Sequence, residues 1–324
     1  MSQFSQLFPP CPKFTDRDVP DQSGKVFIVT GGATGVGFEV ARVLYEKNAA
    51  VYIATRTASK IQNAIENIKK QHPASKGRLE SLILDLANLQ TIKPAVENFI
   101  SKEQRLDVLF NNAGVMGTGP EEKSIQGYEL QLGTNSLGTF LLTRLLEPIL
   151  LSTAAHQGSS GKVRVVWVGS MLDIGTPKGG VVWDSQIDEP TLHSDMMANY
   201  MQSKAGITFL AYEFAKRHGH SGIISNSLHP GMLKTELQRH MSAPMRAFTG
   251  TIFKGPIYGA YTELFAGFSP EVTSKENGRY IIPWGRLGSV PEHMAGGMKS
   301  KEQGGTGSSE KFWNWCEAVT QSYQ

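Results

Sequence analysis

The chain has 324 residues, of which 40% are hydrophobic and 19% charged, a composition typical of a globular protein with a sizeable core. Its 32 basic and 29 acidic residues nearly balance, which argues against nucleic acid or an acidic membrane as a partner. Cys11 and Cys316 lie near opposite ends of the chain, so we expect free thiols rather than a disulfide. The N-terminus lacks the charged start and apolar core of a signal peptide, and the most apolar stretch (139–151) contains two charged residues and a proline. We therefore expect a cytoplasmic protein without a membrane span.

The chain begins with a polar, proline-rich segment, 1–23, which we expect to form an extended arm over the following domain. Residues 26–29 (VFIV) form a short apolar run, which is typical of a strand buried on both faces. They lead into TGGATGVG at 30–37, and apolar residues at helical spacing follow. A strand, a glycine-rich turn and a helix predict the start of a dinucleotide-binding unit. The glycines let backbone N–H groups approach a pyrophosphate at the helix N-terminus.

Strands and helices alternate along the rest of the chain. We predict strands at 50–55, 79–84, 106–110, 163–168, 223–228 and 280–282, and helices at 60–70, 89–104, 128–151 and 199–217. Residues 157–161 are expected to form a turn and 171–198 a long surface excursion. This pattern predicts a Rossmann-type doubly wound parallel sheet of about seven strands flanked by helices. It forms one domain, 24–303, followed by a flexible spacer and a short helix over 304–324, whose Trp313 and Trp315 dock either on this domain or on a neighbour.

Polar and glycine-containing segments follow the predicted strands at the ends where such sheets bind ligands. They are Thr30–Gly37, Arg56, Asp85, Asn111–Gly114, Ser170 and Pro230–Gly231. Their coincidence at one edge of the sheet is more specific than any single motif, and it predicts the cofactor site there.

The residue that follows the second strand indicates which cofactor is bound. An acidic residue there would bind the ribose 2′-hydroxyl of NAD, but the sequence has Thr55 and then Arg56. A guanidinium has the geometry to bind a 2′-phosphate, which favours NADP(H) over NAD(H). The alternative is a solvated surface arginine.

The catalytic hypothesis rests on Tyr200 and Lys204 in YMQSK. Four residues apart on a helix, their hydroxyl and ammonium groups can point into one cleft. A nearby cation favours phenolate and is expected to lower the Tyr200 pKa, making it an acid or base near neutral pH. Ser170 can hold a substrate carbonyl against Tyr200, and Asn135, within the long helix, can complete a proton path through water to Lys204.

These motifs occur in the order found in the short-chain dehydrogenase/reductase family. TGGATGVG, NNAG, Asn135, Ser170, YMQSK and HPG carry the resemblance, over residues 24 to 285. IIPWGR at 281–286 and the long gap between Ser170 and Tyr200 resemble the retinol-dehydrogenase-like branch, including fungal members. Val36 within the glycine motif and Ser136 after Asn135 depart from the commonest pattern.

The resemblance implies roles for individual residues. Tyr200 donates the proton to the carbonyl oxygen, Lys204 binds the nicotinamide ribose and tunes Tyr200, Ser170 positions the substrate, and Asn135 supports the relay. Asp85 either caps the next helix or contacts the adenine, or does both. The residues expected to bind the cofactor are Gly31, Thr34, Gly35, Val36, Gly37, Arg56, Asp85, Leu86, Asn112, Ala113, Gly114, Tyr200, Lys204, Pro230, Gly231 and Thr235.

The segment after HPG is expected to form a substrate lid near 232–270. Thr235 resembles a residue that contacts the nicotinamide carboxamide, although it can also simply start a helix. Methionines are frequent in this segment and on the expected opposite wall, which hints at a bulky, apolar substrate, although core packing explains each of them equally well. They are Met232, Met241 and Met245, and Met171, Met196, Met197 and Met201.

The sequence therefore predicts an NADP(H)-dependent oxidoreductase that interconverts a ketone or aldehyde and an alcohol. An enzyme of the same fold that catalyses a non-redox cyclisation or epimerisation in specialised metabolism, and a cofactor-sensing binding module, are the alternatives. No Cys/His cluster or H-E-x-x-H motif indicates a metal, and Ser170 lacks the second glycine of a nucleophile elbow, which argues against a hydrolase. The resemblance implies a homodimer or homotetramer built from the long helices.

Overall fold

The computed structural model describes residues 4–157, 162–234 and 253–324. The strands are β1 (Val26–Thr30), β2 (Ala50–Thr55), β3 (Arg78–Ile83), β4 (Val108–Asn111), β5 (Val163–Val168), β6 (Trp183–Asp184), β7 (Glu189–Pro190), β8 (Ile223–Leu228), β9 (Tyr280–Ile282) and β10 (Arg286–Gly288). The α-helices are α1 (Phe4–Leu7), α2 (Gly35–Glu46), α3 (Ala58–Gln71), α4 (Ile92–Ile100), α5 (Thr139–Gln157), α6 (Met196–His218), α8 (Pro256–Phe268), α9 (Glu292–Met298) and α10 (Ser308–Thr320). A π-helix, η3 (Leu132–Gly138), leads into α5, and short 3₁₀ turns include η1 (Asp16–Asp18), η2 (Leu89–Thr91) and η4 (Met171–Gly175).

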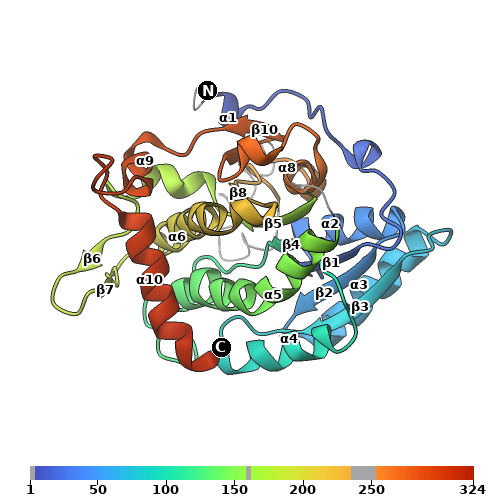
Figure 1. Ribbon diagram of the computed structural model, residues 1–324, viewed down its shortest axis with the longest axis horizontal. Coiled ribbons are helices and arrows are strands. Elements are labelled where there is room, and N and C mark those ends of the chain that lie inside the picture. Colours follow the sequence, from blue (N-terminus) through green and yellow to red (C-terminus); the bar gives the residue numbers. More distant parts are fainter. Residues whose placement is uncertain (1–3, 158–161, 235–252) are drawn as a thin grey trace.

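Eight strands form the central sheet, in the order β10-β9-β8-β5-β4-β1-β2-β3 (Figure 1). Seven of them are parallel, and only β10 runs antiparallel, with Arg286 opposite Ile282. The predicted doubly wound parallel sheet is confirmed, with β10 as an additional strand. Because the chain winds from β1 to β3 and then returns to β4 beside β1, the strand order reverses between β1 and β4. In such sheets ligands bind at this reversal, beyond the carboxyl ends of the strands.

Helices bury an apolar core on each face of the sheet. On one face α2, α3 and α8 supply residues such as Val40, Ile61 and Leu264. On the other face α4, α5 and α6 supply residues such as Phe99 and Phe209. Helix α5 with its π-helical start (Leu132–His156) is long and apolar enough to cross a membrane by length and composition, but 61% of its most apolar window is buried inside the molecule, as in the core helix of a globular protein.

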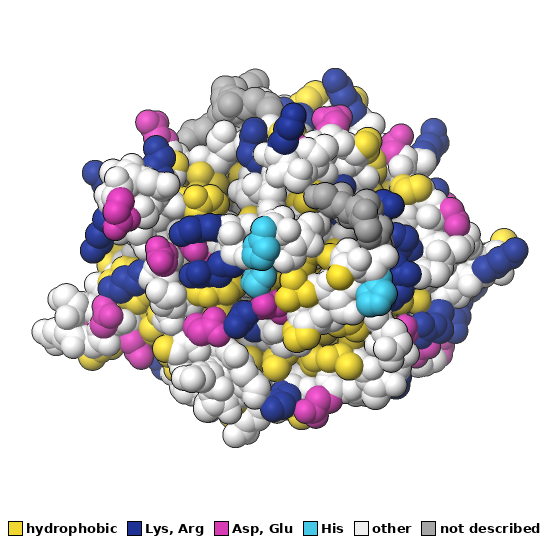
Figure 2. All heavy atoms as spheres, in the orientation of Figure 1, with side chains coloured by type: hydrophobic (Ala, Val, Ile, Leu, Met, Phe, Trp, Pro, Cys, Tyr) yellow, Lys and Arg dark blue, Asp and Glu magenta, His cyan; other side chains and the backbone are white. Residues whose placement is uncertain are grey.

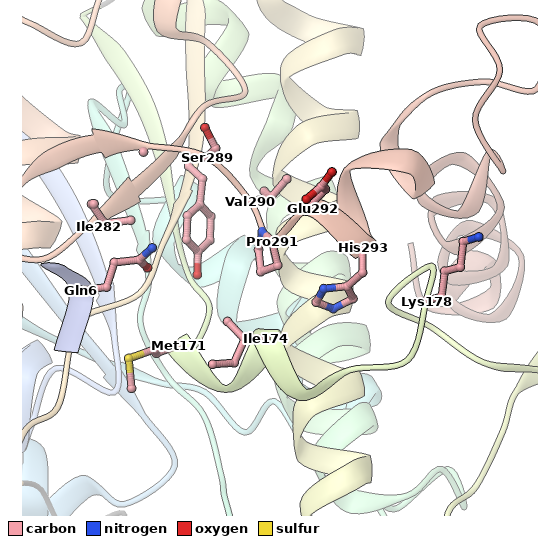
Figure 3. Close-up of a pocket in the computed structure, with 12 residues that line it drawn as sticks. Gln6, Met171, Ile174, Lys178, Ile282, Ser289, Val290, Pro291, Glu292 and His293 are labelled. Carbon is pink, nitrogen blue, oxygen red and sulfur yellow. The ribbon is translucent and has the colours of Figure 1, made fainter. Parts of the chain in front are cut away.

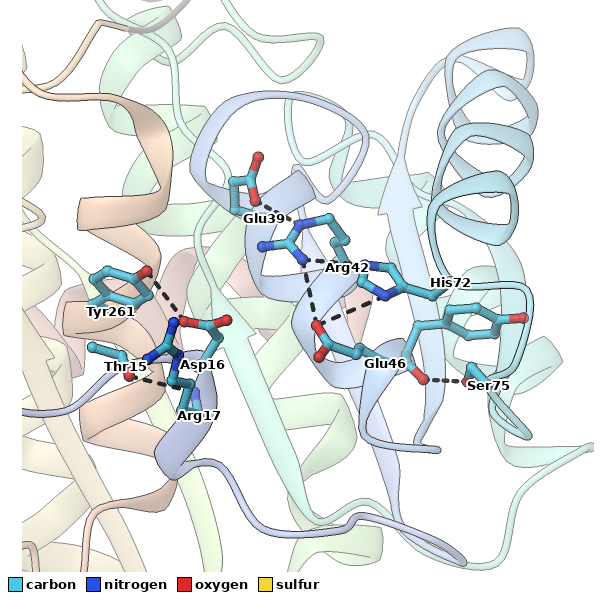
Figure 4. A network of polar contacts seen from close by, with 10 residues as sticks. Thr15, Asp16, Arg17, Glu39, Arg42, Glu46, His72, Ser75 and Tyr261 are labelled. Atoms are coloured by element: carbon cyan, nitrogen blue, oxygen red, sulfur yellow. Dashed lines mark hydrogen bonds and ion pairs between the residues drawn. The ribbon is translucent and has the colours of Figure 1, made fainter.

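The N-terminal arm lies across the helix α8 side of the domain. Phe14 is buried and packs edge-on against Phe265, with ring centroids 5.9 Å apart. The Tyr261 hydroxyl donates to Asp16 at 3.2 Å, beside the Arg42 network of α2 (Figure 4). The arm is therefore attached to the domain by both apolar and polar contacts.

The C-terminal helix α10 docks on the same chain, along α6 and α5 (Figure 1). Trp313 is buried, with its ring centroid 4.9 Å from that of Phe140, and the Arg217 guanidinium lies 4.8 Å from its ring. Trp315 contacts Tyr128 edge-on at 5.9 Å. On the face shown in Figure 2, acidic and basic side chains are scattered together.

Several local features were not predicted. The long surface excursion 171–198 contains η4 and the β6–β7 hairpin. The helix predicted from Leu89 begins as a 3₁₀ turn and ends at Ile100. The helix predicted over 128–151 is π-helical where it carries Asn135, a form that is frequent at functional sites. The predicted turn at 157–161 lies almost wholly outside the described residues.

Candidate active site

The glycine turn after β1 forms a cradle at the N-terminus of α2. The first N–H groups of α2, as in any helix, have no acceptors within the helix. Thr34 precedes the helix, but its side chain makes no capping hydrogen bond to them. A Cβ added at Gly37 would lie 2.5 Å from Asn112 Nδ2 and 2.7 Å from Gly31 O, whereas one added at Gly35 would meet no atom within 4 Å. The turn is therefore tight on its inner side and open on its outer side, which fits a dinucleotide pyrophosphate.

Arg56 and Asp85 follow the two strands that extend the sheet beyond β1. Arg56 is exposed and forms no ion pair within the described part of the chain, which leaves its guanidinium available to a phosphate. Asp85 Oδ1 accepts from Ala87 N–H at 3.0 Å in a local turn, and Leu86 is buried beneath it. The expectation that Asp85 caps the next helix is wrong, because Asn88 is that N-cap and accepts from Gln90 N–H.

The Asn111–Gly114 turn is held to β1 by hydrogen bonds. Thr30 Oγ1 donates to Phe110 O at 3.1 Å and accepts from Ala113 N–H at 2.9 Å. Asn112 Nδ2 donates to Thr30 O at 2.8 Å. These bonds fix the turn opposite the glycine cradle, so both segments border one cleft.

Two of the four predicted catalytic residues meet beside Gly114. A Cβ added at Gly114 would lie 3.1 Å from Lys204 Nζ and 3.2 Å from Asn135 Oδ1, a tight fit that requires these groups to move slightly. The Tyr200 and Ser170 side chains are hydrogen-bonded to each other, and Lys204 Nζ donates to Val168 O at 2.7 Å. Tyr200 and Lys204 come from α6, and Ser170 directly follows β5.

Asn135 is held by its own set of hydrogen bonds. Its Oδ1 accepts from Val115 N–H at 2.8 Å, and its Nδ2 donates to Val115 O at 3.0 Å and to Ser203 Oγ at 2.9 Å. The π-helical turn places this amide inside the molecule, where it links the Gly114 segment to α6. Pro230 and Gly231 lie at the end of β8, and Thr235, Met241 and Met245 lie outside the described residues.

Comparison with known proteins identifies the family. A model of the short chain dehydrogenase family matches residues 25–182. A short-chain dehydrogenase/reductase of Phomopsis amygdali is 44% identical over 99% of this chain and 96% of its own length. Another, bet4 of Neocamarosporium betae, is 41% identical over 99% of this chain and 94% of its own length. The chain belongs to the short-chain dehydrogenase/reductase family. It is an oxidoreductase with the Rossmann-type fold of this family.

Solved structures of short-chain dehydrogenases share this architecture. The Pseudomonas aeruginosa RhlG/NADP active-site complex superposes with a TM-score of 0.63 at 22% identity, covering 84% of this chain and 97% of that one. At this identity the likeness speaks to the fold alone.

Burial governs the pKa of Tyr200 in this short-chain dehydrogenase. Burial raises it to about 12, and although the Ser170 hydrogen bond lowers it, the negative charge of Asp173 raises it further. Burial lowers the pKa of Lys204 to about 8, while Asp173 and Glu263 oppose this effect. The expectation of a lowered Tyr200 pKa is therefore wrong for this arrangement, because desolvation of the phenolate dominates. At neutral pH Tyr200 therefore carries its proton.

Two buried carboxyl groups near Lys204 were missed by the sequence reasoning. Asp173 is fully buried and accepts from Thr208 Oγ1 at 3.2 Å, and burial raises its pKa to about 7. Glu263 on α8 is fully buried with no hydrogen-bond partner among the described residues, and burial raises its pKa to about 8. Nothing in the sequence marks either one, because an acidic residue in a helix or turn is usually exposed.

Glu263 predicts a pH-dependent stability. Its folded-state pKa of about 8 lies above the ordinary 4.5, so the folded protein holds a proton that the unfolded chain releases as pH rises. Stability present below pH 4.5 is therefore lost as pH rises through 8. We expect Glu263→Gln to raise the Tm at pH 8.5 by several degrees and to leave it nearly unchanged at pH 5. Thermal unfolding measured from pH 5 to 8.5 tests this prediction, with Glu271→Gln as the control because Glu271 is exposed. If the Tm of Glu263→Gln and of wild type changed with pH in the same way, the Glu263 carboxyl would have no part in the pH dependence of stability.

A pocket of about 700 Å³ adjoins the catalytic groups (Figure 3). Its described lining consists of Gln6, Met171, Ile174, Lys178, Tyr280, Ile282 and residues 288–293. The Tyr280 hydroxyl donates to Ser170 O at 3.3 Å, and Met171 directly follows Ser170, so two residues that line the pocket adjoin Ser170. Of the methionines expected on this wall Met171 lines the pocket, whereas Met196 is exposed and Met201 packs under Gly175. Within the described residues no cluster of His, Cys, Asp and Glu could hold a metal ion.

Proposed function

We propose that this oxidoreductase uses NADP(H) to interconvert a ketone or aldehyde and an alcohol on a bulky, largely apolar small molecule, with Tyr200 as the acid or base. The observation that carries the proposal is the arrangement of the four residues: Tyr200 is hydrogen-bonded to Ser170, and Lys204 and Asn135 meet beside Gly114. The pocket next to Ser170 supports a bulky substrate, since Met171, Ile174, Ile282 and Pro291 supply apolar surface beside polar groups such as Gln6 and His293.

In this mechanism the bound nicotinamide cofactor supplies or accepts the hydride. Ser170 holds the substrate carbonyl oxygen next to the Tyr200 hydroxyl, to which its own side chain is hydrogen-bonded. Tyr200 then donates its proton to that oxygen as negative charge develops on it. Lys204, charged below its pKa of about 8, stabilises the resulting phenolate. Asn135, whose Oδ1 lies beside the Lys204 ammonium across Gly114, orients the path by which the proton is restored.

The preference for NADP(H) rests on Arg56. Its guanidinium follows β2, where the adenosine ribose binds in doubly wound sheets, and no acidic residue stands at Thr55 to bind a 2′-hydroxyl.

A fluorescence titration with NADPH and NADH tests this preference. We expect Arg56→Ala to weaken NADPH binding about 10- to 100-fold, the range of a lost hydrogen bond to a charged group, and to leave NADH binding unchanged. Arg279→Ala is the matched control, because Arg279 is exposed at the opposite end of the parallel strands, just before β9. Equal NADPH and NADH affinities that survive Arg56→Ala would make NAD(H) the working cofactor, and binding of neither would contradict the enzyme hypothesis.

A further inference from the structure

The N-terminal helix α1 lies at the pocket, far in sequence from the other residues that line it (Figure 3). Gln6 accepts through Oε1 from His229 Nε2 at 2.9 Å, and Arg286 Nη2 donates to Ser5 O at 2.6 Å. His229 is fully buried and begins the His-Pro-Gly turn after β8, and Arg286 is on β10. Helix α1 is thus bonded to two strand ends at the catalytic edge of the sheet.

The Gln6 side chain keeps a hydrogen-bond donor for a ligand. Burial lowers the pKa of His229 to about 3, so its ring is neutral. The buried Nδ1 atom has no hydrogen-bond partner among the described residues, so a proton there would be unpaired, and the tautomer with the proton on Nε2 donates to Gln6 Oε1 at 2.9 Å. With this tautomer the Gln6 amide oxygen faces the histidine. The Gln6 Nε2 group has no partner in the described parts of the chain, and the side chain borders the pocket. A fixed amide N–H₂ group recognises a carbonyl, hydroxyl or carboxylate oxygen.

A second polar group lies across the pocket. In Figure 3 Gln6 and Met171 are on one side, His293 is on the other, and Ile174 and Pro291 lie between them. The His293 Nε2 atom is 2.8 Å from Thr176 Oγ1, whose single hydroxyl proton goes to Asp173 O at 2.8 Å. Nε2 is therefore the donor in this contact, and Nδ1 has no partner among the described residues. The pocket thus offers an amide donor, an apolar middle and an imidazole nitrogen.

We propose that the N-terminal arm forms part of the substrate-binding site, and that Gln6 is a specificity residue for an oxygenated, largely apolar small molecule of several rings. The inference rests on the proposed function, since the carbonyl must reach Tyr200 while the remainder of the molecule fills the pocket. Its volume of about 700 Å³ lies within the range of sites that enclose such ligands. Gln6 binds a substrate oxygen remote from the reacting carbon, and small ketones that do not extend to α1 are bound without it.

Steady-state reduction of two ketones with NADPH tests the inference. The probes are 1-tetralone, which has two rings, and a four-ring steroid diketone, which carries a second oxygen distant from the reacting one. We expect Gln6→Leu to raise KM for the diketone at least fivefold, with kcat, KM for 1-tetralone and the NADPH dissociation constant unchanged. Leu7→Ala is the matched control, because Leu7 is on the same helix, is 38% exposed and does not line the pocket.

Ketone binding is measured separately, by calorimetric titration of both probes into the NADP⁺-bound protein, which cannot reduce them. Diketone binding that Gln6→Leu weakens supports the inference even if no ketone is reduced, in which case only the proposed function fails. If the diketone is reduced, but Gln6→Leu changes neither its KM nor its affinity, the inference is overturned and the proposed function stands. Equal losses in Gln6→Leu and Leu7→Ala overturn it as well, since they would reflect disturbance of the helix, and a wild-type protein that neither binds nor reduces the diketone overturns it too.

Discussion

Tyr200→Phe is expected to lower kcat about 10³-fold or more. Loss of a positioned general acid accounts for an effect of this size, and Ser170 also loses its hydrogen-bond partner in this variant. The substitution removes one hydroxyl from a buried ring that is 5% exposed, so the fold and the cofactor cradle remain. NADPH binding is expected to change far less than kcat, because the glycine cradle lies at the N-terminus of α2 and the substitution removes only one hydroxyl. Single-turnover reduction of a ketone, followed by NADPH absorbance, measures the chemical step directly.

Tyr212→Phe provides the control for this experiment. Tyr212 is on the same helix and is partly exposed, and its side chain makes no hydrogen bond to the described residues. Its variant is expected to turn over like wild type. Wild-type turnover in Tyr200→Phe would remove the phenol from the mechanism and with it the central claim of the proposed function.

Gly37→Ala is expected to have the second large effect, on cofactor binding. The new methyl group would lie 2.5 Å from Asn112 Nδ2 and 2.7 Å from Gly31 O, both of which belong to the turns that form the cradle. Relief requires a backbone shift at the cradle, with an overpacking cost of about 1–3 kcal/mol. We expect the NADPH dissociation constant to rise at least 100-fold and the Tm to fall by several degrees.

Gly296→Ala is the matched control for this substitution. Gly296 lies within α9, and a Cβ there would meet no atom within 4 Å. Alanine is the better helix former, so the Tm should stay level or rise slightly. NADPH affinity retained in Gly37→Ala would show that the dinucleotide does not use this turn.

Much of the sheet could be predicted because its strands are buried on both faces. Strands β2, β5, β8 and β9 begin and end at the predicted residues, since their apolar runs stop where polar loops begin. Strand β10 was missed because Arg286–Gly288 has no period of its own and is held only as an antiparallel edge. The π-helical turn that carries Asn135 was not predicted, because the spacing of apolar residues in the sequence does not reveal the hydrogen bonds of Asn135.

The catalytic edge was predictable in position but less so in its electrostatics. Ser170, Tyr200 and Lys204 meet as their places at a strand end and on one helix face require. The sign of the Tyr200 pKa shift depends on burial and on Asp173, and both follow from packing. The hydrogen bond between Gln6 and His229 joins residues 223 positions apart, so no local sequence pattern predicts it.

The docked C-terminal helix also covers surface on the two longest helices. Trp313 fills the space between Phe140 of α5 and Phe214 of α6, the helices from which the family resemblance implies that a dimer or tetramer is built. Removal of α10 would therefore expose these aromatic side chains to water.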